Sequence, residues 1–172
     1  MTIRHEKPSD YDDVYELVKI SFATNSDDDG TTSDYLVELR KKETFIPELS
    51  LVAVNDDGKI IGQIVLYKTD IITLNGKSTE LLLSPICVHP NYFRRGVARL
   101  LINESFRIAK EIGYKAVFLC GDPELYKKFG FVPSFEYKIF HISDDSKKAE
   151  WSMVYELVKN GLKGISGTVD TV

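Results

Sequence analysis

The residues with the clearest potential for chemistry form a short basic loop between an apolar strand and the most regular helix pattern in the chain. The loop runs from His89 to Gly96 and includes Arg94 and Arg95. Unpaired N–H groups and the positive dipole at a helix N-terminus favour an anion, and the small residues Gly96 and Ala98 leave room for phosphate oxygens. The segment is either a pyrophosphate site or a turn with solvated arginines, and the spacing alone favours neither.

Two common nucleotide-binding motifs do not occur at this loop. No Gly-x-Gly-x-x-Gly follows a strand, and no complete Walker sequence, Gly-x-x-x-x-Gly-Lys-Ser/Thr, is present. A redox or kinase function therefore lacks its usual sequence support.

Two segments together resemble one family. His89–Arg99 is similar to the pyrophosphate-binding motif of GNAT acetyltransferases, Gln/Arg-x-x-Gly-x-Gly/Ala: Gly96 and Ala98 match, and Phe93 stands where Gln or Arg is usual. Gly121–Pro133 resembles the Tyr-x-x-Phe-Gly-Phe segment of the same superfamily. Its Gly-Asp-Pro start is similar to the bacterial predicted acetyltransferases called YhbS-like.

The resemblance implies the fold and the cofactor. It implies a mixed α/β (α+β) sheet in which an antiparallel meander is followed by a parallel βαβ unit, with a splayed cofactor cleft between Glu80–Val88 and Ala116–Cys120. The co-substrate would be acetyl-CoA (coenzyme A), without a metal. The implied contacts with the cofactor come from Ile86, Cys87, Val88, Arg94, Arg95, Gly96, Val97, Ala98 and Arg99.

The resemblance also implies an N-acetyltransferase that moves an acetyl group to a primary amine of an unidentified small molecule or peptide by direct attack. Tyr126 matches the family tyrosine near the CoA sulfur, where a phenol with a pKa of about 10 could reprotonate the thiolate. Its alternative role is packing under the cofactor. Glu80 is a candidate general base, although a solvated side chain or a base role for water is also open. His89 fits a loop residue better than a base.

Two other functions stay open. Phe93 and the uncertain base favour an acyl-CoA-binding sensor or regulatory module without turnover. A structural or partner-binding domain without a cofactor is the third possibility. The acidic run Asp27-Asp28-Asp29 could attract a cationic amine or form a solvated loop.

The charge, apolar runs and cysteines of the sequence indicate which classes of partner and which compartment to expect. The net charge of −4 argues against a general nucleic-acid binder. No apolar run reaches the ~18 residues of a membrane span, and the polar N-terminus is unlike a signal peptide. Cys87 and Cys120 lie in apolar runs, which predicts buried free thiols and a cytoplasmic protein. We expect a monomer or homodimer.

The elements that position these residues follow from periodicity and turn signals. We expect one domain over residues 1–158 and a loose Gly-rich tail over 159–172. Pro85 lies within an expected strand, where it marks either a bulge or an early strand end. A helix capped by Ser9 and a short helix between Asp122 and Gly130 are also expected. The remaining expected helices are 34–42 and 97–112, and the expected strands are 2–4, 51–54, 60–72, 80–88, 116–120, 137–140 and 151–157.

Overall fold

The computed structural model describes residues 1–23 and 30–171, so the acidic run at 27–29 lies outside the described residues. The chain forms two compact units, one of Met1–Leu66 with Ser84–Ile108 and the other of Tyr67–Leu83 with Ala109–Val172. It passes between them within β3 (Ile60–Thr73), β4 (Gly76–Val88) and α3 (Val97–Glu111). In neither unit does a described helix combine the length and apolar character of a membrane span.

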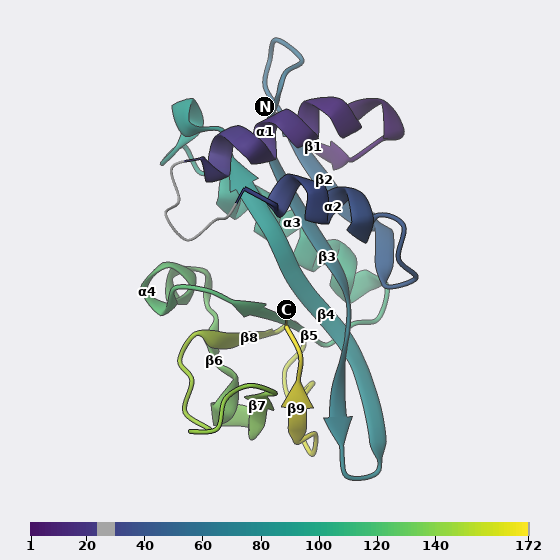
Figure 1. Cartoon of the computed structure of the whole chain (residues 1–172), viewed down its shortest axis with the longest axis vertical. Coiled ribbons are helices and arrows are strands. Elements are labelled where there is room, and N and C mark those ends of the chain that lie inside the picture. The colour runs from purple at the N-terminus through teal and green to yellow at the C-terminus, as the bar shows by residue number, and fades with distance from the viewer. Residues whose placement is uncertain (24–29, 172) are drawn as a thin grey trace. The chain divides into compact units, whose positions relative to one another are not determined.

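The first unit contains the start of the sheet, in the order β1-β2-β3-β4, and three longer helices. β1 (Thr2–His5) pairs antiparallel with β2 (Phe45–Val54). β2 begins at Phe45, six residues before the expected start at Leu51. Pro47 and Glu48 interrupt the apolar run that indicates a strand, but they do not end the strand itself. α1 (Tyr11–Phe22) and α2 (Thr32–Leu39) lie side by side (Figure 1).

The entry into α1 differs from the predicted cap. Pro8–Asp10 form a short 3-10 turn, η1, so Asp10 and not Ser9 stands at the N-cap position of α1. The Asp10 carboxylate instead accepts a bidentate pair of hydrogen bonds from the Arg4 guanidinium and one from the Lys7 N–H. Val14, Leu17 and Val18 are buried on one face of α1, as their helical spacing allows.

α3 packs on β3 at a residue without a side chain. A Cβ atom at Gly62 would lie 2.9 Å from Val97 Cγ1 and 3.0 Å from Leu101 Cδ1, so the glycine lets the helix approach the strand closely. The apolar side chains of Val97, Leu101 and Ile108 are buried. The helix ends at Glu111, one residue before the expected end at Ile112, whose side chain is 47% exposed.

The second unit continues the sheet in the order β3-β4-β5-β8-β6, with β9 pairing with β3 and β7. β5 (Ala116–Cys120) is parallel to β4, as the βαβ pattern predicted, and antiparallel to β8 (Ser152–Glu156). The other short elements of this unit are α4 (Pro123–Tyr126), η3 (Lys127–Phe129), β6 (Val132–Pro133), η4 (Ser134–Tyr137), β7 (Ile139–His141) and β9 (Gly167–Val169). Asp122 and Gly130 bound α4 and η3 as expected.

The expectation of a loose tail is wrong at Gly167–Val169, which form the strand β9. β9 pairs antiparallel with β3, where Ile71 faces Val169, and parallel with β7, where Ile139 faces Gly167. Val169 is fully buried. Three residues carry too little local pattern to indicate a strand, and their partners lie far away in sequence.

The structure decides between the alternatives for Pro85 and tests the predicted burial of the two cysteines. β4 continues through Pro85 to Val88, so this proline does not end the strand early, and the Ser84–Pro85 peptide is cis.

Cys87 is buried as predicted, whereas Cys120 is exposed and the prediction of a buried thiol there is wrong. The Cys120 thiol pairs with the Thr171 hydroxyl beyond β9, a contact that local sequence cannot show.

Candidate functional site

The basic loop of the first unit has two residues in the left-handed region just before α3. Arg94 has φ 59° and Gly96 has φ 81°. A Cβ atom at Gly96 would meet nothing within 4 Å, so the backbone conformation, and not a steric contact with the protein, is what favours glycine at this position. The Leu100 N–H donates to the Gly96 carbonyl (3.1 Å), which starts the helix directly after the loop.

An aromatic side chain supports one of the loop arginines. The Arg95 guanidinium lies 5.3 Å from the centroid of the Tyr92 ring. The Tyr92 hydroxyl accepts a hydrogen bond of 2.9 Å from Asn55 Nδ2, which fixes the ring from the other end. The His89 ring contacts Tyr92 edge-on, and its Nδ1 accepts from the Asn91 N–H (3.2 Å). His89 therefore supports the loop, which is the role that the sequence favoured over that of a base.

The charge around the loop is suited to an anion. The first turn of α3 contains no acidic residue, and Arg94, Arg95 and Arg99 are exposed. N–H groups of an initial helical turn, together with nearby arginines, form a favourable environment for phosphate oxygens. Phe93, at the position where the family motif has a polar residue, is 52% exposed.

The end of β4 lies directly before this loop and is held by contacts with α1 and β3. The Ser21 hydroxyl donates to the Val88 carbonyl (3.1 Å), and the His89 N–H donates to the Ile61 carbonyl (2.8 Å).

Burial raises the pKa of the Cys87 thiol to about 12, although hydrogen bonds from Ser21 and from the backbone of Gln63 oppose this shift. Cys87 therefore stays a neutral thiol at physiological pH and is unsuited to act as a nucleophile.

Tyr126 lies in the second unit at the end of α4. The Asp122 side chain caps this helix by accepting from the Glu124 N–H (2.9 Å), and the Tyr126 N–H donates to the Asp122 carbonyl (3.1 Å). The Tyr126 ring packs edge-on against Phe131, with 5.9 Å between centroids. Burial, and secondarily the charge of Asp122, raise the pKa of the phenol, so it is protonated at neutral pH and able to act as an acid.

Glu80 also lies in the second unit, and its carboxylate holds the start of β5. Oε2 accepts hydrogen bonds from the N–H groups of Lys115 (2.8 Å) and Ala116 (3.1 Å). The residue is only 3% exposed, so the expectation of a solvated side chain is wrong. Burial raises the pKa of Glu80, while the two backbone N–H groups and the charge of Lys115 lower it by less.

The structure thus divides the predicted site residues between the two units. The first unit contains the strand end Ile86–Val88 and the loop and helix start Arg94–Arg99, and the second contains Glu80 and Tyr126.

Sequence reasoning missed four residues around these groups. Ser21, Asn55 and Tyr92 support the group in the first unit, and Gly121 lies against the Tyr126 ring in the second. Tyr92 and Gly121 lie within the two segments that carry the family resemblance, whereas no local pattern indicates Ser21 or Asn55.

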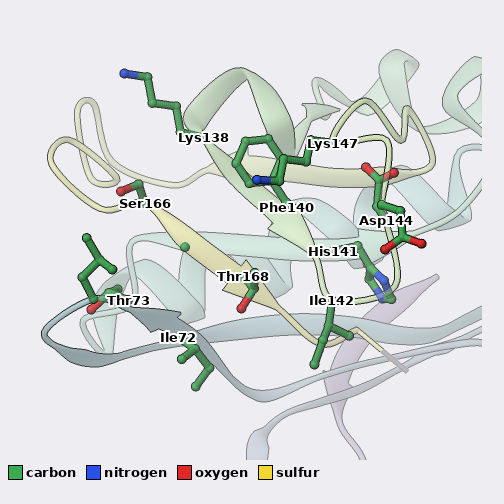
Figure 2. Close-up of a pocket in the computed structure, with 13 residues that line it drawn as sticks. Ile72, Thr73, Lys138, Phe140, His141, Ile142, Asp144, Lys147, Ser166 and Thr168 are labelled. Carbon is green, nitrogen blue, oxygen red and sulfur yellow. The ribbon is translucent and has the colours of Figure 1, made fainter.

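A pocket of about 820 Å³ in the second unit involves none of the predicted site residues. Figure 2 shows Phe140 and His141 of β7, Ile72 of β3 and Thr168 of β9 around it. Its mixture of exposed apolar and charged side chains does not resemble the expected cofactor site.

Comparisons with known proteins match this chain to GNAT acetyltransferases. Residues 2–134 match the family described as "Acetyltransferase (GNAT) domain". The chain is 29% identical over 171 residues to the uncharacterized N-acetyltransferase YhbS of Escherichia coli strain K12, covering 99% of this chain and 95% of that protein.

Solved structures agree with this comparison. The crystal structure of the GNAT family N-acetyltransferase YhbS from Escherichia coli in complex with CoA matches with a TM-score of 0.86 and 27% identity, covering 99% of this chain and 89% of that one. A GNAT family acetyltransferase from Brucella melitensis in complex with acetyl-CoA has the same fold, with a TM-score of 0.77, 22% identity and coverage of 98% and 94%. The mixed sheet predicted from the sequence is therefore confirmed as the GNAT fold.

Proposed function

The chain belongs to the GNAT acetyltransferase family, and on that premise we propose that it transfers an acetyl group from acetyl-CoA to a primary amine of a small molecule or peptide. The observation that carries the proposal is the loop before α3. Its left-handed residues turn the chain into a helix start that lacks acidic side chains and is flanked by exposed arginines. The likeness to YhbS, whose crystal structure contains CoA, supports the same assignment.

In this proposal the CoA pyrophosphate binds at the N-terminus of α3. Backbone N–H groups from Gly96 to Arg99 donate to its oxygens, and Arg94 and Arg95 contribute charge. The contact between Arg95 and Tyr92 restrains this arginine before CoA binds, which reduces the entropy lost on binding. The backbone of Ile86, Cys87 and Val88 is proposed to pair with the pantetheine arm.

The proposed chemical step is a direct attack of the neutral amine on the thioester. The C–N bond forms and the carbonyl electrons move to oxygen, where a strand N–H stabilises the oxyanion. The tetrahedral intermediate then collapses, the C–S bond breaks, and the thiolate takes a proton from Tyr126. The acetylated nitrogen loses its surplus proton to solvent, and the tyrosinate regains a proton from solvent, so the enzyme returns to its starting state. A phenol is a suitable donor because it is protonated at neutral pH and thiolates accept a proton readily.

The base that removes the ammonium proton is either Glu80 or water. A raised pKa suits Glu80 to this role, whereas the two hydrogen bonds to its Oε2 give it a structural role in β5. Glu80→Gln separates the two roles. Loss of a base should remove the acidic limb of the pH–rate profile and slow transfer by ~10²-fold or more. An unchanged limb and rate would leave Glu80 a structural residue and favour water.

The function is tested by combining two measurements on the full chain. Calorimetry with acetyl-CoA reports binding, and thiol release in a broad panel of primary amines reports transfer. We expect saturable binding and amine-dependent release. Binding without release from any amine would support the non-catalytic sensor, to which the exposed Phe93 points. Absence of binding would overturn the CoA site itself.

A further inference from the structure

Gly121 lies against the aromatic ring of Tyr126 more closely than any side chain would permit. A Cβ atom at position 121 would lie 2.3 Å from Cε2 and 2.8 Å from Cδ2 of that ring. Gly121 is not one of the glycines with positive φ, so its backbone conformation is open to other residues. The tyrosine ring, and not the backbone, is therefore what excludes a side chain at this position.

The backbone on both sides of this contact is fixed. The Gly121 N–H donates to the Trp151 carbonyl (3.0 Å), which extends the β5–β8 pairing by one residue. The Tyr126 N–H donates to the Asp122 carbonyl (3.1 Å), and its own carbonyl accepts from the Phe131 N–H (3.3 Å). A side chain at 121 would therefore be accommodated mainly by movement of the tyrosine ring.

The ring has aromatic neighbours as well. Phe131 contacts it edge-on and Phe129 lies 6.5 Å away, centroid to centroid, in a tilted arrangement. Between these rings and Gly121, a rotation of the Tyr126 side chain is the movement that would relieve the overlap. To bring 2.3 Å to an ordinary contact, the ring must move by ~1 Å, and the hydroxyl moves with it.

We propose that Gly121 is a positioning residue for Tyr126, because the missing side chain at 121 determines where the phenol hydroxyl lies. The inference rests on the proposed function, in which this hydroxyl protonates the departing thiolate. A displacement of ~1 Å at a reacting group can cost about 10²-fold in rate. Gly121 thus acts through the tyrosine and does not itself contact the reacting atoms.

The test compares Gly121→Ala with a matched glycine substitution. At Gly161, which also has no positive φ, an added Cβ would meet Lys115 and Val158 at 2.9 Å and does not meet Tyr126. Both variants should lower the melting temperature. Only Gly121→Ala should slow single-turnover thiol release from acetyl-CoA, by at least ~10-fold, both with water and with benzylamine as acceptor.

A double-mutant cycle isolates the hydroxyl. Tyr126→Phe keeps the ring and removes the group to be positioned, so Gly121→Ala should destabilise this background but slow it no further. If Gly121→Ala slows the Tyr126→Phe enzyme as much as the wild type, the glycine does not act through the hydroxyl and the proposal is overturned.

A second readout does not depend on turnover. In protein with ¹³C-labelled tyrosine, the Tyr126 ring signal is assigned by its loss in Tyr126→Phe. We expect Gly121→Ala to shift this signal and Gly161→Ala to leave it in place. An unmoved signal would refute the positioning role. If Gly121→Ala shifts the signal but Tyr126→Phe turns over at the wild-type rate, the positioning role stands and the acid role in the proposed function is refuted.

Discussion

Tyr126 is the residue whose protonation state matters most to the proposed reaction. Its pKa is raised above the ordinary 10.0, first by burial and then by Asp122. An acid catalyst works while it is protonated, so on the alkaline side of neutral pH the chemical step should stay fast until pH rises through this raised pKa. Tyr126→Phe should be at least ~10-fold slower in single turnover and should lack that alkaline limb.

Acetyl-CoA affinity provides the control for this substitution. Phenylalanine keeps the ring that packs against Phe131, so binding measured by calorimetry should change little. A parallel loss of affinity would mean that the hydroxyl holds the cofactor, and a wild-type single-turnover rate would remove Tyr126 from the chemistry.

Gln63 of β3 is a second residue with a measurable consequence. Its side chain is fully buried, and neither amide atom has a hydrogen-bond partner within residues 1–23 and 30–171. An unpaired buried amide is costly, so Gln63→Met should raise the free energy of unfolding by about 1 kcal/mol. Urea denaturation measures this change, and a clear loss of stability would show that the amide serves the fold.

Sequence alone identified part of this chemistry. The Tyr126 segment and the Arg94–Ala98 loop could be recognised because their residues are adjacent in the chain. The two backbone partners of the Glu80 carboxylate lie across a parallel strand pair, so no local pattern indicated that Glu80 is buried.

Among the elements, α3 and its preceding loop carry the cofactor proposal. Gly96 has φ 81°, a conformation that Asn and Asp tolerate better than most residues. Gly96→Asn and Gly96→Asp have similar shapes and differ in charge. A carboxylate at a helix N-terminus favours the helix but repels a pyrophosphate. The Asp variant should therefore bind CoA at least ~10-fold more weakly than the Asn variant while melting at the same or a higher temperature.

Calorimetry at two salt concentrations checks this prediction. The difference in affinity between the two variants should shrink as salt rises, because added ions screen the repulsion. Equal CoA affinities for the Gly96→Asn and Gly96→Asp proteins at low salt would place the pyrophosphate elsewhere.

Sequence patterns predicted the elements unevenly, for physical reasons. β5 matched to the residue and α3 within one, because each is a continuous apolar run or a long amphipathic repeat. β6 and β9 were missed because two or three residues gain their strand conformation only from distant partners. The two motifs that resemble the GNAT family indicated the fold, whereas the contacts that support the loop come from residues distant in sequence, such as Asn55.

For the whole molecule, two buried carboxylates give stability opposite dependences on pH. Asp10 has its pKa lowered from the usual 3.8, chiefly by the hydrogen bonds from Arg4, so its contribution is present above that value and is lost as pH falls through the lowered pKa. Glu80 has its pKa raised from 4.5 by burial, so its contribution is present below that value and is lost as pH rises through the raised pKa.

Denaturation curves from acid to neutral pH for the wild type, Asp10→Asn and Glu80→Gln measure the two effects. The advantage of the wild type over Asp10→Asn should shrink in acid, below about pH 4. Relative to Glu80→Gln, the wild type should lose stability as pH rises above 4.5. Difference curves that run parallel would contradict these opposite linkages.

The position of β9 has a consequence for how the protein is made. Its pairing with Ile71 and Ile72 uses residues 168 and 169, close to the end of the described chain. All residues of the first unit have been synthesised once Ile108 is added, whereas the second unit needs β9 to complete its sheet. Domains tend to fold as units during synthesis. The first unit can therefore fold while Ile71 and Ile72 of β3 are not yet paired with β9. Until residues 168 and 169 are available, Ile71 and Ile72 lack this strand partner, and an unpaired strand edge is a site where chains tend to aggregate.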